Sequence, residues 1–325
     1  MLRLFRLPNL TRLRLLCHIA LALLAGGAVP ASAAESIAVV LSERGGVYAE
    51  FFDALNTSLS QMPGRKVVRL AGVAAPGEKV DEAELADASL ILAVGAGAAR
   101  AVARSDGTVP VLSVLVPRLA YERILNESGR RSRPSSFSAL YLDQPLPRQL
   151  NLLRLALPGR KRVAALLGPE SAGMSQRLRA AAGKAGFELQ SEQVSEEGEI
   201  VPALNRLLPG NDVLLALPDG GVFNRNTARP ILLTTYRYQR PLVGFSQAYV
   251  TAGALAAVYS TPAQMARQTV ELLRGLPAGR VSLGAPQYPV YFSVAVNRNV
   301  ARSLGLDVPD EAWLKEALER AGEGE

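Results

Sequence analysis

The sequence SLILAVGAGAARAVAR at positions 89–104 joins a buried strand to a helix through a glycine-rich turn. The apolar run at 89–94 is typical of a strand that is covered on both faces. A helical pattern at 98–104 follows, and a second apolar run, VPVLSVLV, occupies 109–116. Because a strand, a helix and a further strand in this order form a βαβ unit, this stretch predicts an α/β fold with a parallel sheet.

The same alternation extends along the chain in both directions. Further strands are predicted at 37–41, 67–70, 162–167, 188–193, 213–217 and 241–245, with an extended run at 288–296. Further helices are predicted at 48–61, 145–157, 174–185, 200–208, 226–236, 261–273, 297–304 and 309–321. In the last helix we expect Trp313, Leu314 and Leu318 to anchor it to the protein. Strands and helices that alternate throughout favour parallel sheets flanked by helices.

The order of elements occurs twice. The strand that starts near Leu90 begins 53 residues after Ile37, and the strand at Val213 begins 50 residues after Val163. We therefore predict two similarly built lobes, the first from 35–138 with 248–288 and the second from 139–247 with 289–325. Elements left over after two complete lobes imply several crossings between them. Such lobes form a hinged clamshell with a cleft.

The first 34 residues have the pattern of a secretory signal peptide. An apolar core at 15–28 follows four basic side chains, Arg3, Arg6, Arg12 and Arg14. Small residues at 31–33 indicate cleavage near Ala33 or Ala34. We therefore expect the mature protein in the periplasm.

Removal of this leader has chemical consequences. His18 and Cys17 are the single histidine and cysteine of the chain, so a mature form would lack imidazole and thiol groups. This excludes Ser-His-Asp and Cys-His catalysis, zinc sites with His or Cys ligands, and disulfides. We expect no catalytic residue, no metal site and no cofactor. The mature charge, 32 basic against 29 acidic side chains, gives no argument for nucleic acid as a partner.

Ligands of open parallel sheets sit beyond the carboxyl ends of the strands. In the first lobe this rule selects Ser42, Tyr48 and the turn Gly95-Ala96-Gly97, where main-chain N–H groups can approach an anionic group. In the second lobe it selects the segments 168–171, 218–221 and 245–247, and within them Asp219 as a counter-charge for an ammonium group, with Phe245 and Ser246. Tyr48 and Phe245 could cover an apolar or aromatic group. Each residue also has a structural reading: the glycines serve turn geometry, Asp219 caps a helix, and Tyr48 lies on a helix face.

Two further motifs carry less weight. The run Gly95 to Arg100 follows a strand and opens a helix, as a dinucleotide fingerprint does, but Arg100 occupies its third glycine position. We therefore do not expect NAD binding. Arg130, Arg131 and Arg133 form a basic loop, which we interpret as a solvated connection between lobes.

Three segments together resemble a known family. They are LILAVGAGAA at 90–99, QPLPRQLNLLRLALPGRKRVAALL at 144–167 and VAVNRNVARSLGL at 294–306. The chain resembles the ABC-transporter substrate-binding proteins of the periplasmic binding protein type I fold, particularly the group that includes tryptophan- and tyrosine-type binders. It departs from the family pattern at Ala96 and Gly97, where Thr is usual, and at Val116-Pro117, which lacks the preceding Asp. Asp219 is retained but is followed by Gly-Gly rather than Asn.

The resemblance implies a small-molecule ligand and an inner-membrane ABC permease as partner. The favoured hypothesis is an exported, monomeric solute-binding protein that captures a small, amino-acid-like molecule by hinge closure. The alternative is a periplasmic sensor or accessory protein that uses the same clamshell to contact a membrane protein. An enzyme on this scaffold would have to act without histidine.

Overall fold

A computed structural model describes residues 36–60, 67–74, 80, 82–85, 87–105, 107–129, 136–276 and 282–322. Residues 35–325 form one compact unit. The proposed leader with its cleavage site, and the basic loop of Arg130, Arg131 and Arg133, lie outside the described residues. Within the described part of the chain, no helix is long and apolar enough to cross a membrane.

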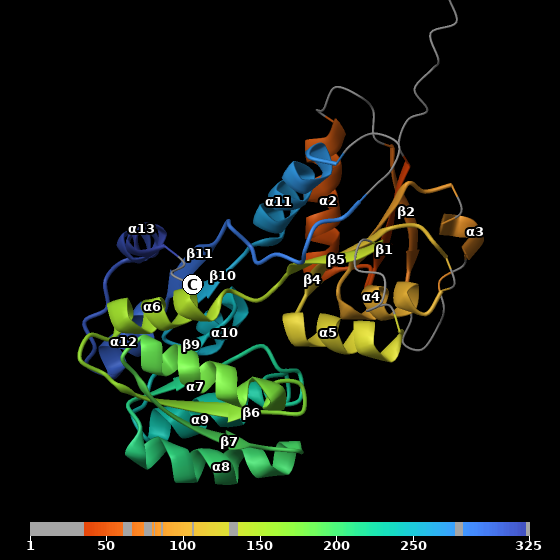
Figure 1. Cartoon of the computed structure of the whole chain (residues 1–325). Coiled ribbons are helices and arrows are strands. Elements are labelled where there is room, and N and C mark those ends of the chain that lie inside the picture. The colour runs from red at the N-terminus through yellow and green to blue at the C-terminus, as the bar shows by residue number, and fades with distance from the viewer. Residues whose placement is uncertain are drawn as a thin grey trace, which may run out of the picture. The chain divides into compact units, whose positions relative to one another are not determined.

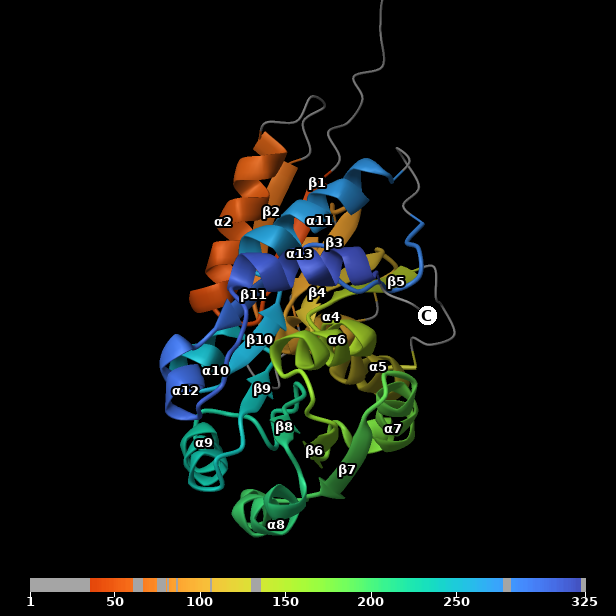
Figure 2. The ribbon, with the colours of Figure 1, turned by 90° about the vertical axis from the view of Figure 1, so that its left-hand side faces the viewer.

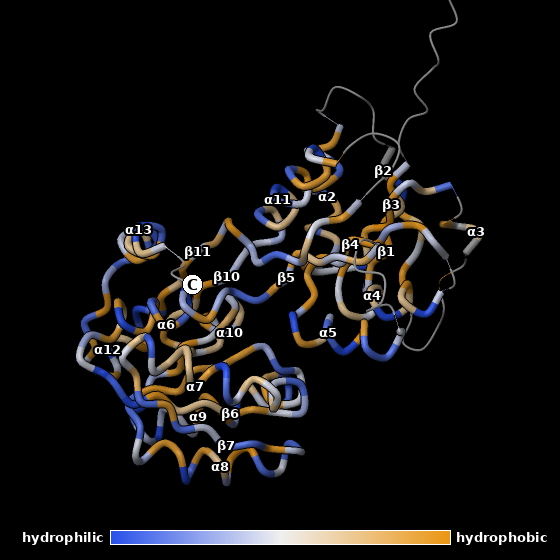
Figure 3. The backbone as a smooth tube through the Cα atoms, in the orientation of Figure 1, coloured by the Kyte–Doolittle hydropathy of each residue, from blue (hydrophilic) through white to orange (hydrophobic). Residues whose placement is uncertain are grey.

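The first sheet contains five parallel strands in the order β2-β1-β3-β4-β5. They are β1 (Ser36–Leu41), β2 (Val67–Val73), β3 (Leu90–Val94), β4 (Val111–Val116) and β5 (Phe137–Tyr141). The side chains of β3 and β4 are buried throughout, as the continuous apolar runs predict. Figure 3 shows hydrophobic residues along the strands of both sheets.

Helices cover both faces of the first sheet. On one face, α2 (Gly46–Ser60) packs beside α11 (Pro262–Arg274), and Phe51 and Leu55 share a buried cluster with Met265 and Val270 (Figure 2). The opposite face is covered by α4 (Ala96–Ala103) and α5 (Arg118–Glu127). Together with α3 (Glu82–Leu85), these helices contribute to a second buried cluster. The turn at 95–97 therefore lies between a central strand and a buried helix.

The second sheet has six strands in the order β11-β10-β9-β8-β6-β7. They are β6 (Arg162–Leu167), β7 (Glu188–Gln193), β8 (Val213–Leu215), β9 (Leu242–Gly244), β10 (Ala256–Tyr259) and β11 (Ser293–Val296). All neighbours are parallel except β10 and β11, which are antiparallel. Both lobes in Figure 1 thus confirm the predicted α/β class, with helices on the two faces of each sheet.

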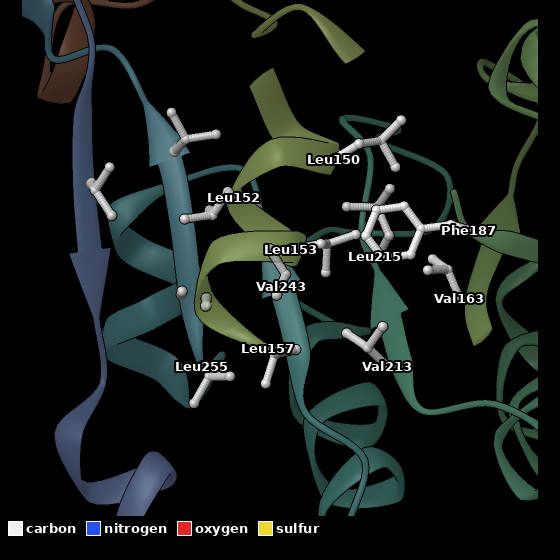
Figure 4. Close-up of a cluster of buried hydrophobic side chains, with 14 of the residues drawn as sticks. Leu150, Leu152, Leu153, Leu157, Val163, Phe187, Val213, Leu215, Val243 and Leu255 are labelled. Atoms are coloured by element: carbon white, nitrogen blue, oxygen red, sulfur yellow. The ribbon is translucent and has the colours of Figure 1, made fainter. Parts of the chain in front are cut away.

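Alternate residues of β6 supply the two cores of the second lobe. Val163 packs with α6 (Leu146–Ala156), α7 (Ser175–Lys184) and α13 (Glu311–Ala321), and Figure 4 shows leucines of α6 facing Leu215 and Val243. Ala164 faces the other cluster, with α8 (Ile200–Leu207), α9 (Ala228–Arg237) and α10 (Gln247–Ala252). Short 3₁₀ turns precede α7 and α8 and follow α8, at Ala172–Met174, Glu197–Glu199 and Leu208–Gly210. Another short helix, α12 (Arg298–Ser303), follows β11.

The expectation for the C-terminal helix was partly wrong. Leu314 and Leu318 are buried in the second lobe, as predicted, but Trp313 is 44% exposed. Consecutive helical residues point about 100° apart, so Trp313 cannot share the inward side of both leucines.

Three segments connect the lobes. The first joins β5 to α6, and the second joins β10 to α11. In the third, Gln287 pairs with β5 through Ala139 and Tyr141, and the chain then enters β11 of the second sheet. The structure corrects two boundaries: β5 completes the first sheet beyond residue 138, and α10 and β10 place 248–259 in the second lobe rather than the first.

Candidate functional site

Ser42 ties the end of β1 to the turn that follows β3. Its hydroxyl donates a hydrogen bond to the carbonyl of Val94 (3.0 Å) and accepts one from the N–H of Ala98 (2.9 Å). The N–H of Gly95 donates to the carbonyl of Val114 (2.8 Å), which links the same turn to β4. The carboxyl ends of three neighbouring strands are thus held together by local hydrogen bonds.

The turn requires glycine at position 95. Its φ is +91°, and a Cβ there would lie 2.5 Å from Cε1 of Tyr48 and still closer to the hydroxyl of Ser42. At Gly97, a Cβ would be 3.2 Å from the same hydroxyl. Tyr48 is partly buried, and burial, followed by the charge of Glu43, raises the pKa of its phenol. The structure therefore brings Ser42, Tyr48 and the turn Gly95-Ala96-Gly97 together.

An acid just after β5 accepts a hydrogen bond from the helix that follows β4. The cap position of α5 is Pro117, which offers no side-chain hydrogen bond, and the carboxylate of Asp143 accepts the N–H of Arg118 instead. The Arg118 side chain donates to Glu122 (2.7 Å) and to the hydroxyl of Tyr288 (3.0 Å). Burial raises the pKa of Asp143 to about 6, although the hydrogen bond from Arg118 opposes this. Asp143 thus supplies to the start of α5 the side-chain acceptor that Pro117 cannot offer.

In the second lobe, Asp219 is the acid that accepts hydrogen bonds from the neighbouring loops. It is 2% exposed, and its Oδ2 accepts from the N–H of Gly168 (3.1 Å), the N–H of Ser171 (2.8 Å) and the hydroxyl of Ser171 (2.6 Å). Its Oδ1 accepts the N–H of Gly221 (2.9 Å). Three of the four donors share Oδ2, and the whole carboxylate is enclosed by its own loops. Asp219 therefore fastens the loop after β6 to the loop after β8.

The glycines around Asp219 are set by its close packing. A Cβ on Gly168 would lie 2.7 and 2.8 Å from the two carboxylate oxygens, and 2.5 Å from a methyl group of Val222. A Cβ on Gly221 would meet Pro169 at 2.9 Å. Close packing around Asp219 therefore accounts for glycine at both positions.

Three aromatic rings join the loops after β8 and β9. The ring centroid of Phe223 lies 6.1 Å from that of Phe245 and 6.0 Å from that of Tyr249, and Phe245 and Tyr249 are 5.3 Å apart. Phe223 and Tyr249 are buried, whereas Phe245 stays partly exposed. Ser246 caps α10 by accepting the N–H of Tyr249 (3.2 Å). Phe245 can therefore offer an apolar surface at the carboxyl end of β9.

One contact brings the two sets of loops together. Arg123, on the helix that follows β4, donates from Nη2 to the carbonyl of Pro169 (3.2 Å), in the loop that follows β6. The neighbouring residue, Glu170, accepts the N–H of Gly220 (3.2 Å). The carboxyl end of one sheet thus approaches the carboxyl end of the other.

Arg148 connects the crossing segments. It is 5% exposed, and Nη1 donates to Oε1 of Gln144 (2.6 Å) and to the carbonyl of Pro289 (2.8 Å). Gln144 donates to the hydroxyl of Ser260 (2.9 Å), which donates to the carbonyl of Tyr291 (2.7 Å). All three crossings therefore share one buried polar network.

The sequence rule located the loops but missed several of their residues. Phe223, Arg123 and Asp143 lie outside the selected segments, and Glu170 lies in the selected segment 168–171 but was not chosen as a contact residue. The eight selected residues form two groups, one at each sheet. Their contact with a ligand stays a prediction.

Comparison with known proteins identifies the fold. No family model matches the chain, and no curated protein matches it. Among solved structures, an ABC domain from Streptococcus pneumoniae, in complex with L-Trp, has a TM-score of 0.60 at 16% identity and covers 87% of this chain and 98% of its own. A ligand-free, open substrate-binding protein with adhesive properties from Clostridium difficile has a TM-score of 0.62 at 17% identity, covering 85% and 96%. A conserved domain protein from Vibrio cholerae has a TM-score of 0.61 at 15% identity, covering 87% and 98%. The chain therefore has the periplasmic binding protein type I fold that the sequence segments predicted.

Proposed function

We propose that this chain is an exported solute-binding protein that captures a small molecule between its two lobes. The observation that carries the proposal is the opposition of the two sheets. Arg123, on helix α5 of the first lobe, reaches the loop after β6 of the second, and both α5 and this loop follow the carboxyl ends of strands. Ligands of this class of sheet bind at such ends.

Each lobe offers a different kind of contact. The turn at Gly95–Gly97 opens α4, where main-chain N–H groups and the helix dipole favour an anionic group. The second lobe offers the partly exposed ring of Phe245 for an apolar group. A ligand that touches both lobes would favour the closed arrangement only through contacts that it makes there.

The wider biological role follows from the fold likeness. We propose that the protein acts in the periplasm, as a monomer, and passes its ligand to an inner-membrane ABC permease. Three similar structures support this only as an analogy of fold. The chain's own support is the hinge: three crossings joined by Arg148 and Gln144 permit rotation of two intact lobes.

Thermal unfolding of the chain from Ala34 onward, against amino acids, small acids, nucleosides and sugars, tests this proposal. A ligand at 100 times its dissociation constant, binding only the folded state, adds about 2.7 kcal/mol. We expect one chemical class to raise the unfolding temperature by a few degrees, with one molecule bound per chain. If no class raises it, the solute-binding proposal fails. The alternative of a sensor or accessory protein that contacts a membrane protein would then be favoured.

A further inference from the structure

Two carboxylates lie at the carboxyl end of the second sheet, and their surroundings differ. Asp219 is buried and accepts four hydrogen bonds from its own chain. Three of these donors already share Oδ2, and at 2% exposure the carboxylate is closed off by its own loops. Asp219 is therefore poorly suited to receive an ammonium group, although its charge first suggested that role.

Glu170 has the opposite character. It is partly exposed, and among the described residues its carboxylate accepts a single hydrogen bond, from the N–H of Gly220 (3.2 Å). No ion pair of Glu170 is present in the described part of the chain. Its second oxygen thus keeps its capacity to accept a donor.

The position of Glu170 is fixed by the loops around it. It lies between Pro169, whose carbonyl accepts Arg123 of the other lobe, and Ser171, whose N–H and hydroxyl bind Asp219. Gly220 is exposed, and a Cβ there would lie 3.8 Å from both oxygens of Glu170. Asp219 thus holds the loop that carries Glu170, and Arg123 of the first lobe contacts the same loop.

We propose that Glu170, rather than Asp219, is the counter-charge for the ligand, and that the ligand carries a protonated amine. This inference rests on the proposed function, because it concerns the same interlobe site. An ammonium group would donate to the open oxygen of Glu170, while an anionic or apolar remainder would reach the Gly95–Gly97 turn or Phe245. The expected ligands are amino acids and related amines.

Matched ligand pairs test this proposal. Each L-amino acid is compared with the carboxylic acid that lacks only its amino group, such as L-tryptophan with 3-indolepropionate and L-phenylalanine with 3-phenylpropionate. We expect at least one amine-bearing member to bind, and its partner to bind about tenfold or more weakly, because a hydrogen bond to a charged group is lost. Binding that is restricted to amine-free members would overturn the proposal.

Glu170→Gln separates the role of Glu170 from that of the loop. Glutamine retains an oxygen for the N–H of Gly220, so the unfolding temperature should not change. Affinity for the amine-bearing probe should fall about tenfold to hundredfold, with no change for its amine-free partner. Glu316→Gln is the matched control, since Glu316 is an exposed acid of α13, and it should leave both affinities unchanged.

The remaining outcomes are also decisive. An unchanged affinity for the amine in Glu170→Gln would overturn the proposal. Equal weakening of the binding of both members in Glu170→Gln would overturn the proposal and assign Glu170 to lobe closure. Arg123→Gln should then also weaken the binding of both members. If no matched pair binds but another class raises the unfolding temperature, this assignment fails and the solute-binding proposal stands; if no class does, both fail.

Discussion

Replacement of Asp219 with asparagine removes one negative charge from a site built to accept four hydrogen bonds. The amide retains one oxygen, which can serve the three donors now bound to Oδ2, all from Gly168 and Ser171. Its NH₂ group must then face the N–H of Gly221, which Oδ1 now accepts at 2.9 Å. Two facing donors cannot bond to each other, so the hydrogen bond from Gly221 is lost at a position that is 2% exposed. Without the negative charge, the three hydrogen bonds from Gly168 and Ser171 also become weaker.

The expected destabilisation is about 2 to 4 kcal/mol, from about 1 to 3 kcal/mol for an unsatisfied buried donor and the loss of charge assistance. Urea denaturation followed by circular dichroism measures it as a lower midpoint at unchanged slope. Glu170→Gln is the matched control, because its carboxylate accepts one hydrogen bond at a partly exposed position. We expect that control within about 0.5 kcal/mol of the unaltered protein.

A midpoint for Asp219→Asn equal to that of the control would refute this reasoning. It would mean that Asp219 does not fasten the two loops. Loss of ligand affinity without loss of stability would return Asp219 to the ligand-binding role that was first predicted for it.

Four further predictions follow from the geometry. Gly95→Ala should lower the unfolding temperature more than Gly159→Ala, because both positions have positive φ but only Gly95 would also clash; equal shifts would refute the tight turn. Arg148→Met should cost about 1 to 3 kcal/mol in urea denaturation, since Gln144 and Pro289 lose a buried donor, and an unchanged midpoint would count against the hinge network. Tyr249→Phe should leave stability unchanged or raise it, because the buried hydroxyl has no partner among the described residues; a loss above about 1 kcal/mol would reveal one. Burial raises the folded-state pKa of Asp143 to about 6, so its contribution to stability is present below about pH 4 and declines as pH rises through 6. Compared with the unaltered protein, Asp143→Asn should therefore be more stable at pH 8 than at pH 4. An equal difference in urea midpoint between the two proteins at both pH values would contradict this.

The sequence predicted those elements whose burial is continuous. The runs at 89–94 and 162–167 became β3 and β6, because a strand covered on both faces must be apolar at every position. The predictions omitted β5, β10, α5 and α10. β10 is four residues long and follows a six-residue helix, so neither shows a period that a single sequence reveals. That omission also misplaced the lobe boundary near residue 256.

The candidate site was predictable as a set of loops but not as a set of roles. The carboxyl-end rule selected the segments after β1, β3, β6, β8 and β9, because it depends only on strand order. Which acid is available depends on partners distant in sequence: Oδ2 of Asp219 is occupied by donors of Gly168 and Ser171, about 50 residues earlier. No local pattern could distinguish Asp219 from Glu170.

The central claim is that one small molecule closes two lobes, and a distance between the lobes tests it most directly. Spin labels can be attached after Arg100→Cys and Thr251→Cys, two exposed positions on α4 and α10, in the chain from Ala34 onward, which has no other cysteine. We predict that a ligand found by thermal unfolding, bound at one molecule per chain, shifts the measured distance distribution to a shorter value. Saturation with that ligand and an unchanged distribution would contradict capture by closure.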